Sequence, residues 1–132
     1  MTVDDNKALV RRFIREIFEQ GRVESVDELC AEDFIGHTWG EMDRDGLRKT
    51  TARVGEALAD VHFAVEDEIA EGDRVAVRVT ASARQVGVGR SYTIGEIHIF
   101  RFRDGKVIEH WHQYDQLGRA RQLQPEAASA AT

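Results

Sequence analysis

The sequence predicts an α+β fold, in which helices pack on one face of a bent antiparallel sheet. Apolar residues recur at helical spacing through the first half of the chain. After Asp60 they alternate with polar residues, which is the spacing of half-buried strands, and glycine-containing turns separate the alternating runs. Helices followed by a run of antiparallel strands are typical of this fold class.

Residues 4–20 are predicted to form a strongly amphipathic helix. Its apolar positions come in pairs that repeat every four residues: Leu9 and Val10, Phe13 and Ile14, Ile17 and Phe18. Asp4 or Asp5 can cap the first amides, and Gly21 tolerates the left-handed turn that ends a helix. We expect this helix to cover one face of the sheet.

Two shorter helices and an extended segment complete the first half. A weaker apolar pattern over residues 23–30 indicates a short second helix, and residues 33–37 read as extended. Asp43 or Asp45 can cap a third helix, whose apolar positions recur at three and four over residues 47–58.

The second half is predicted to form four long antiparallel strands, at residues 61–69, 75–81, 93–103 and 106–114. Gly72 and Asp73 separate the first two, glycines 87 and 89 mark a looser loop, and Asp104 with Gly105 forms a tight turn between the last two. Residues 125–132 have neither periodicity nor large apolar groups. We therefore expect one domain at residues 1–124 followed by a flexible tail.

Composition excludes several classes of function. The chain has 132 residues and a net charge of −6, the wrong sign for binding nucleic acid or an anionic membrane surface. Cys30 is the only cysteine, so neither an intrachain disulfide nor a cysteine-based zinc site can form, and its place in an apolar pattern suggests an inert thiol. With no signal-like N-terminus, the expected location is a reducing cytoplasm.

The turn at Asp104 and Gly105 sets the expected register of the last hairpin. A two-residue turn pairs Phe100 with Glu109, His98 with Trp111 and Glu96 with Gln113. One face of the hairpin then carries aromatic walls and a few ionisable groups, and it would line a cavity under the first helix: Glu96, His98, Phe100, Phe102, Val107, Glu109, Trp111, Gln113 and Asp115. The opposite face carries several isoleucines and predicts a homodimer contact: Ile97, Ile99 and Ile108, with Arg101, His110, His112 and Tyr114.

Asp115, Glu96 and His98 are the candidates for chemistry on the cavity face. An apolar pocket raises the pKa of a carboxylate toward neutrality, where it can exchange protons, and a histidine can donate to an enolate oxygen. In a strict register Asp115 lies about 13 Å from the position opposite His98, so a bulge or a bridging substrate is required. The alternative for Asp115 is a turn or cap residue, and for His98 a hydrogen-bonded wall residue.

Several further residues have expected roles in binding, some of them with an alternative. Glu96, Phe100, Trp111 and Gln113 are expected to contact a substrate. His37 and Trp39 either close the mouth of the cavity or pack on the surface. His110 and His112 have the spacing of two metal ligands on one strand, but the sequence offers no third ligand nearby, which favours a solvated or interface role and no metal site.

Motifs for nucleotide binding, serine hydrolysis and zinc proteolysis are absent, which leaves cofactor-free acid/base chemistry or binding alone. Five segments together resemble the SnoaL-like polyketide cyclase family of the nuclear-transport-factor-2-like superfamily: Phe34–His37, Ala70–Arg78, Phe100–Trp111, Asp115–Gly118 and Gln122–Leu123. The resemblance extends from the first helix to about Leu123, and its most specific part is DGKVIEHWHQYDQLG.

The resemblance implies a cone-shaped α+β barrel, usually dimeric, with a deep pocket and no metal or organic cofactor. It implies that Asp115 is the general acid/base of an aldol cyclisation, that His98 supports the enolate, and that His37 lies near the pocket mouth. Gly36 and Gln124 depart from the family pattern at the mouth and at the C-terminal closure.

Three functions remain open at this point, because this fold hosts many activities. The first is a cofactor-independent cyclase or isomerase acting on a bulky, hydrophobic carbonyl compound. The second is a hydroxylase-like relative that lets a reduced aromatic substrate meet oxygen. The third is a binding module for small hydrophobic molecules.

Overall fold

The computed structural model describes residues 1–124, so the tail expected at residues 125–132 lies outside the described residues. The elements follow in the order α1 (Val3–Phe13), η1 (Ile14–Glu19), α2 (Glu24–Leu29), β1 (Cys30–Gly36), α3 (Arg44–Ala57), β2 (Leu58–Glu71), β3 (Arg74–Gln85), β4 (Arg90–Arg103), β5 (Lys106–Tyr114) and α4 (Gln116–Leu123). Within this part of the chain no helix is long and apolar enough to cross a membrane.

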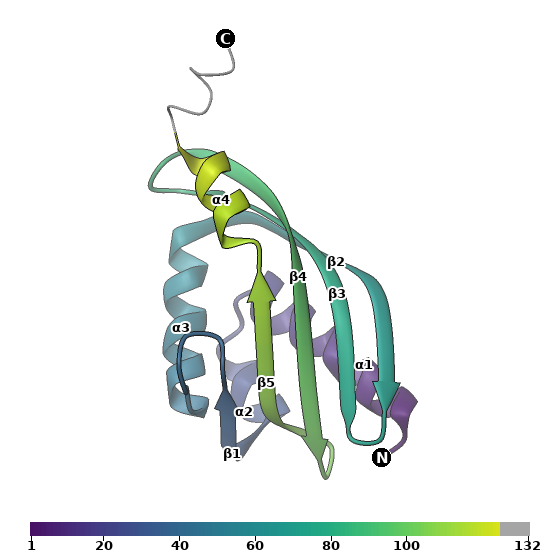
Figure 1. Cartoon of the computed structure of the whole chain (residues 1–132). Coiled ribbons are helices and arrows are strands. Elements are labelled where there is room, and N and C mark those ends of the chain that lie inside the picture. Colours follow the sequence, from purple (N-terminus) through teal and green to yellow (C-terminus); the bar gives the residue numbers. More distant parts are fainter. Residues whose placement is uncertain (125–132) are drawn as a thin grey trace.

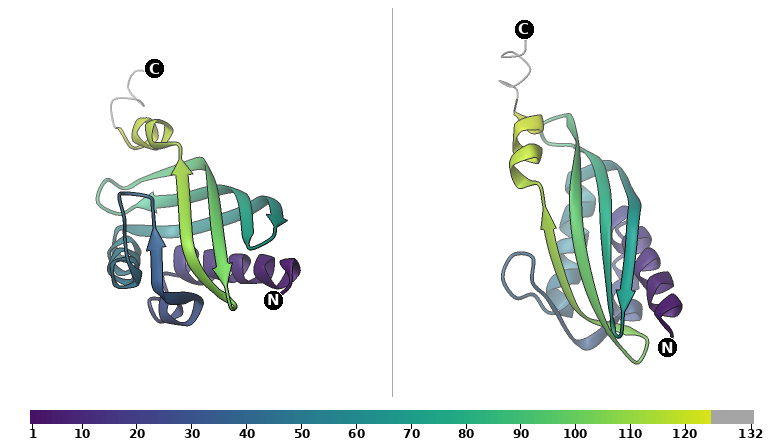
Figure 2. Two further views of the ribbon diagram at one scale, coloured as in Figure 1. Left: turned by 60° about the horizontal axis from the view of Figure 1, so that its bottom comes forward. Right: turned by 45° about the vertical axis from the view of Figure 1, so that its right-hand side comes forward.

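The five strands form one curved sheet in the order β1-β5-β4-β3-β2. All neighbours are antiparallel except β1 and β5, which run parallel. Helices α1, α2 and α3 lie on one side of the sheet, and α4 sits at the end of β5 (Figures 1 and 2). This confirms the predicted α+β class and adds two features that the sequence did not predict, the pairing of β1 and the helix α4.

The first helix begins two or three residues earlier than a cap at Asp4 or Asp5 would place it. Thr2 is the N-cap, and it forms a capping box in which its hydroxyl accepts from the Asp5 amide while Asp5 accepts from the Thr2 amide. The last turns widen into the π-helix η1, and Gly21 ends the helix with φ of 66°. At the third helix, Asp43 is the cap as predicted, since its side chain accepts from the Gly46 amide at 2.8 Å.

The hairpin of β4 and β5 contains a bulge that overturns the predicted register. Asp104 and Gly105 form the expected tight turn, both with positive φ. Phe102 pairs with Val107, but the next pair is Arg101 with Glu109, so Ile108 is an extra residue. Beyond the bulge every side chain of β5 faces the side opposite to the one that a straight register gives it.

The main core lies between α1 and the sheet. Phe13 is fully buried and packs edge-on against Phe100, with ring centroids 5.1 Å apart. Cys30 is buried in the same core, and burial raises the pKa of its thiol to about 12, which keeps it protonated. This agrees with the inert thiol expected from the sequence.

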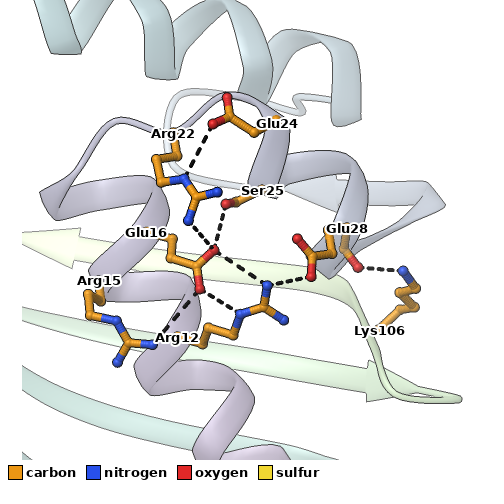
Figure 3. A network of polar contacts seen from close by, with 8 residues as sticks. All are labelled: Arg12, Arg15, Glu16, Arg22, Glu24, Ser25, Glu28 and Lys106. Carbon is orange, nitrogen blue, oxygen red and sulfur yellow. Dashed lines mark hydrogen bonds and ion pairs between the residues drawn. The ribbon is translucent and has the colours of Figure 1, made fainter.

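A buried carboxylate, Glu16, links η1 to α2 (Figure 3). Glu16 is only 6% exposed, and it accepts hydrogen bonds from Ser25 Oγ at 2.6 Å and Arg12 Nε at 2.5 Å. Arg22 contacts it at 3.4 Å, and Arg12 also pairs with Glu28. The hydrogen bonds from Ser25 and Arg12 hold the pKa of Glu16 below its usual value despite burial.

We expect Glu16→Gln to lower the free energy of unfolding by about 2 kcal/mol, because the buried donors lose a charged acceptor. Urea unfolding of both proteins at neutral pH measures the difference. Glu24→Gln is the matched control, since Glu24 is exposed and its one ion pair within residues 1–124 is with Arg22, so its loss should change stability by less than about 0.5 kcal/mol. Equal losses in the two variants would contradict a special role for Glu16.

Candidate active site

A cavity of about 550 Å³ lies between the helices and the concave face of the sheet. Its walls come from η1, α3 and strands β2 to β5, and Arg119 of α4 lies at one end. Apolar and aromatic side chains dominate the lining, including Phe18, Phe63, Tyr92, Ile94 and Tyr114. Both the size and the lining are typical of a site for an organic molecule.

Four ionisable side chains form one hydrogen-bonded chain in the wall of this cavity. Oε1 of Glu96 lies 2.8 Å from Nε2 of His98 and 3.0 Å from Nε2 of His112. Nδ1 of His98 lies 2.9 Å from Nε2 of His110. The rings of His98 and His112 stack with centroids 4.0 Å apart, which fixes both imidazoles against the same carboxylate.

Burial and hydrogen bonding together determine which of these groups carries charge. It is the main cause that lowers the pKa of His98 to about 4 and that of His110 well below its usual value, so both rings are neutral at pH 7. Burial pushes the pKa of Glu96 upward, but the hydrogen bonds from His112 and His98 outweigh it and hold that pKa at about 2. The raised pKa expected for a carboxylate in this pocket is therefore wrong for Glu96.

The charges dictate where the protons lie. Because Glu96 is an anion, it accepts from Nε2–H of both His98 and His112. Neutral His98 then has a lone pair on Nδ1, which accepts from Nε2–H of His110. For His112 this leaves Nδ1 as the ring nitrogen that the chain of hydrogen bonds does not use.

Strands β4 and β5 place the four ionisable side chains on one face of the sheet. Glu96 and His98 alternate on β4 and so point to the same face of the sheet. The bulge at Ile108 turns His110 and His112 of β5 onto that face as well, where His98 pairs with His112. Phe18 of η1 covers the imidazoles from the helix side, with its ring centroid 5.3 Å from that of His98.

Exposure separates the members of the cluster. The His98 side chain has no exposed surface, whereas that of His112 is 13% exposed and that of Glu96 9%. All of them lie at the cavity wall, and His112 is the most exposed of the four, since His110 is only 4% exposed. A molecule in the cavity would therefore meet His112 before it meets His98.

The structure places Asp115 away from this cluster. Its carboxylate accepts from the Gly118 amide at 2.9 Å and caps α4, which is the alternative that the sequence left open. Asp115 is exposed and is not among the residues that line the cavity. Its catalytic role stays a prediction, without a contact in the site to support it.

The other expected contact residues divide between the cavity and its surroundings. Trp39 lines the cavity mouth, 57% exposed, with its ring edge-on to Tyr114. Phe100 is fully buried in the core behind the cavity. The bulge moves Trp111 and Gln113 to the opposite face of the sheet, which corrects their predicted place in the pocket wall.

His37 also contacts the opposite face rather than the cavity. Its ring stacks on Trp111 with centroids 5.2 Å apart, and its Nε2 lies 2.8 Å from Oε2 of Glu109. Glu109, which the straight register put in the pocket, also pairs with Arg101 at 2.7 Å. His37, Trp111 and Glu109 thus form a polar and aromatic group outside the cavity.

His110, His112 and Tyr114 are the site residues that the predicted register assigned to the wrong face. A signal was present, because Val107 and Ile108 are adjacent apolar residues that break the alternation next to the turn, and both are buried. With the bulge placed there, the histidine pair at spacing two falls on the same face as Glu96 and His98.

Glu96, His98 and His112 are also the residues that could hold a metal ion. Each offers one donor atom, and these atoms lie within 4.8 Å of one another. Two imidazoles and one carboxylate suit several divalent transition metals. A cation would use the same Nε2 and Oε1 atoms that the hydrogen bonds use, so it would have to replace two protons.

Comparison with known proteins agrees with the resemblance seen in the sequence. Residues 8–123 match the family described as SnoaL-like polyketide cyclase. Among curated proteins, none matches the chain significantly.

Several solved structures share the fold over almost the whole chain. TsrD from Streptomyces laurentii is 27% identical, with a TM-score of 0.83, over 93% of this chain and 97% of its own. IdmH from Streptomyces antibioticus, described as a candidate polyketide cyclase, is 26% identical, with a TM-score of 0.78, over 89% and 97%. AclR from Streptomyces galilaeus, described as a candidate hydroxylase, is 24% identical, with a TM-score of 0.80, over 92% and 97%, and supports the fold alone.

Proposed function

Because the chain belongs to the SnoaL-like polyketide cyclase family, we propose that it is an acid/base enzyme for a bulky, polyketide-like carbonyl compound. In this proposal, side chains of the cavity remove a proton from a carbon next to a carbonyl group. The enolate then closes a ring by aldol addition or is protonated at another position. The observation that carries the proposal is the hydrogen-bonded chain of His112, Glu96, His98 and His110 in the wall of a largely apolar cavity.

His112 is the proposed general base. Imidazole suits proton transfer at neutral pH, and Nδ1 of His112 is free of the hydrogen bonds within the cluster. When Nδ1 takes the proton, the electron pair of the C–H bond moves to the carbonyl oxygen and an enolate forms. The Glu96 carboxylate, 3.0 Å from Nε2, stabilises the imidazolium that results.

Glu96 and His98 are proposed as positioning residues. Glu96 fixes the orientation and tautomer of His112, and His98 in turn holds Glu96 from the buried side at 2.8 Å. The chain ends at His110, which keeps the proton of its Nε2 directed at His98. A neutral His98 leaves the single negative charge of Glu96 for the cation that forms on His112.

Tyr114 is the proposed donor to the enolate oxygen. Its ring centroid lies 5.1 Å from that of His112, and it borders the cavity at the mouth beside Trp39. A phenol hydroxyl next to the base can donate a hydrogen bond to the oxygen on which charge develops. In a cyclisation, the alkoxide formed by carbon–carbon bond formation takes back the proton held by His112, so no net proton is gained or lost.

The proposal is tested by hydrogen exchange at an acidic carbon, which needs no knowledge of the natural substrate. The full chain in D₂O is incubated with methyl 1-tetralone-2-carboxylate, a bicyclic β-keto ester, and deuterium incorporation is followed by mass spectrometry above the spontaneous rate. We expect protein-dependent exchange without oxygen consumption. Saturable binding without exchange would favour a binding module, and oxygen uptake would favour a hydroxylase-like reaction.

Tyr114→Phe should lower the exchange rate about 10²-fold and leave the affinity for the probe nearly unchanged, because the hydroxyl donates mainly to the charge that develops on the enolate. Tyr92→Phe is the matched control, since Tyr92 lines the cavity but lies on β4 beside Arg119. A similar loss in both variants would mean that neither hydroxyl acts specifically on the enolate.

A further inference from the structure

An arginine at the α4 end of the cavity has no role in the chemistry proposed above. Arg119 borders the cavity and also a smaller hollow of about 370 Å³ beneath α4. We propose that Arg119 binds an anionic oxygen group, a carboxylate, on the substrate. This inference rests on the proposed function, because it names the class of compound that the same cavity would take, a bulky carbonyl compound that is also an acid.

Arg119 lacks an acidic partner within the described residues. Among residues 1–124, no carboxylate lies within 4 Å of the Arg119 guanidinium, whereas Arg84 on the neighbouring sheet surface pairs with Asp60. Arg119 instead donates from Nη2 to Oε1 of Gln85 at 3.2 Å, a neutral acceptor. A guanidinium remains charged at any pH that the folded protein meets, so its charge in this part of the cavity is uncompensated within the described residues.

Arg119 also carries an unsatisfied hydrogen-bond donor. Nε of Arg119 is buried and has no hydrogen-bond acceptor, one of only two such buried side-chain atoms within residues 1–124. A buried N–H without a partner is unfavourable, and a ligand oxygen that reaches it removes that cost. The planar guanidinium fork offers two parallel donors, which fit a carboxylate better than a single carbonyl oxygen.

The Arg119 guanidinium also lies at a distance from the proposed base that one ligand can span. Its Cζ lies 5.0 Å from the ring centroid of Tyr92, which orients the fork at that point of β4. Tyr92 and Glu96 share one face of β4 four residues apart, a separation of about 13 Å along the strand. A rigid polycyclic compound can extend from Arg119 to the cluster, so its carboxylate would set which carbon meets His112.

Arg53 is the other arginine in the lining, and it differs from Arg119 in two respects. Its side chain projects from α3 as an exposed group, and its Nη2 lies 3.4 Å from Oγ1 of Thr50. A guanidinium in open water gives little discrimination between an anionic and a neutral ligand. Arg119, partly buried and stacked on Tyr92, is therefore the residue to which we assign the selectivity.

The test compares two ligands that share a ring system and differ in charge. The full chain is titrated with anthraquinone-2-carboxylate and with anthraquinone-2-carboxamide at low salt, and binding is followed by calorimetry. We expect the carboxylate to bind about 10- to 100-fold more tightly. Arg119→Gln should reduce this ratio to about one by weakening only the carboxylate, and Arg119→Lys should leave an intermediate ratio because it keeps charge but loses the fork.

Arg121→Gln is the matched control, since Arg121 is an exposed arginine on the same helix, and it should keep the ratio of the unmodified protein. Equal affinity for the two ligands, or an unchanged ratio in Arg119→Gln, would overturn the assignment while the exchange assay stays unaffected. Failure of both ligands to bind would count against the cavity as a site for planar carbonyl compounds, and so against the proposed function as well. Circular dichroism of each variant checks that the fold is kept.

Discussion

Glu96→Gln should lower the rate of protein-dependent C–H exchange by about 10³- to 10⁴-fold. The amide keeps the size of the carboxylate and can still accept a hydrogen bond, but it offers no negative charge to the imidazolium that forms on His112. It also places an N–H group where two imidazole donors already point. The affinity for the neutral probe should change little, so the loss falls on turnover rather than on binding.

Glu109→Gln is the matched control for this experiment. Glu109 lies in the same hairpin and also contacts a histidine, His37 at 2.8 Å, but on the face of the sheet opposite to the cavity. Its replacement should leave exchange within about twofold of the unmodified rate. If Glu96→Gln retained exchange and Asp115→Asn abolished it, the proposed cluster would be wrong and the role that the family resemblance implies for Asp115 would be right.

Most of the fold could be predicted because its signals are local. The paired apolar residues of α1, the left-handed Gly21, the Asp43 cap and the alternation along β2 to β5 each act within a few residues. The helix α4 was missed because its eight residues contain few large apolar groups. The parallel pairing of β1 with β5 joins segments about 75 residues apart, and single-sequence periodicity carries no information about such contacts.

The choice of β5 residues for the cavity wall depended on a shift of one residue in the register between β4 and β5. The sequence identified Glu96 and His98 correctly as members of the cavity wall, because β4 alternates without interruption. On β5 a straight register put Trp111 and Gln113 in the cavity, and the bulge at Ile108 put His110 and His112 there instead. A side-chain period of two makes any such insertion reverse the face of all residues beyond it. The face proposed for a homodimer changes accordingly, although Ile97 and Ile99 remain on it and the dimer stays a prediction.

The prediction of a raised pKa for Glu96 was wrong for a related reason. The expectation of a raised value considered only the apolar surroundings, as the sequence shows no hydrogen-bond partner for this carboxylate. In the structure two imidazoles donate to one oxygen of Glu96, and that stabilises the anion more than burial disfavours it. Whether burial or hydrogen bonding has the larger effect on this pKa depends on contacts between strands. The predicted register was wrong and placed His112 on the other face of the sheet, where it could not be a hydrogen-bond partner of Glu96.

The buried histidines should make the protein lose stability in mild acid, before ordinary carboxylates begin to titrate. In the unfolded chain a histidine has a pKa near 6.5, whereas burial lowers the pKa of His98 in the folded protein to about 4. Between these values the unfolded state binds a proton that the folded state does not, so the free energy of unfolding falls as the pH falls. Well above pH 6.5 neither state is protonated at His98 and this contribution to the pH dependence is absent.

The full effect of His98 is about 3 kcal/mol, of which about 2 kcal/mol is lost between pH 7 and pH 5. His110 changes stability in the same direction, because its pKa is also lowered by burial. Glu96 adds a separate loss at lower pH, as its pKa of about 2 lies below the usual 4.5 and its stabilising effect disappears as the pH falls through that range.

Urea unfolding at pH 7, 6 and 5 measures the histidine part alone. His98→Gln should flatten this dependence, whereas His62→Gln, at an exposed position on β2, should leave it unchanged. A free energy of unfolding that is the same at pH 7 and pH 5 would show that the histidines titrate in the folded protein as they do in the unfolded chain, and the neutral His98 on which the proposed cluster depends would then be wrong.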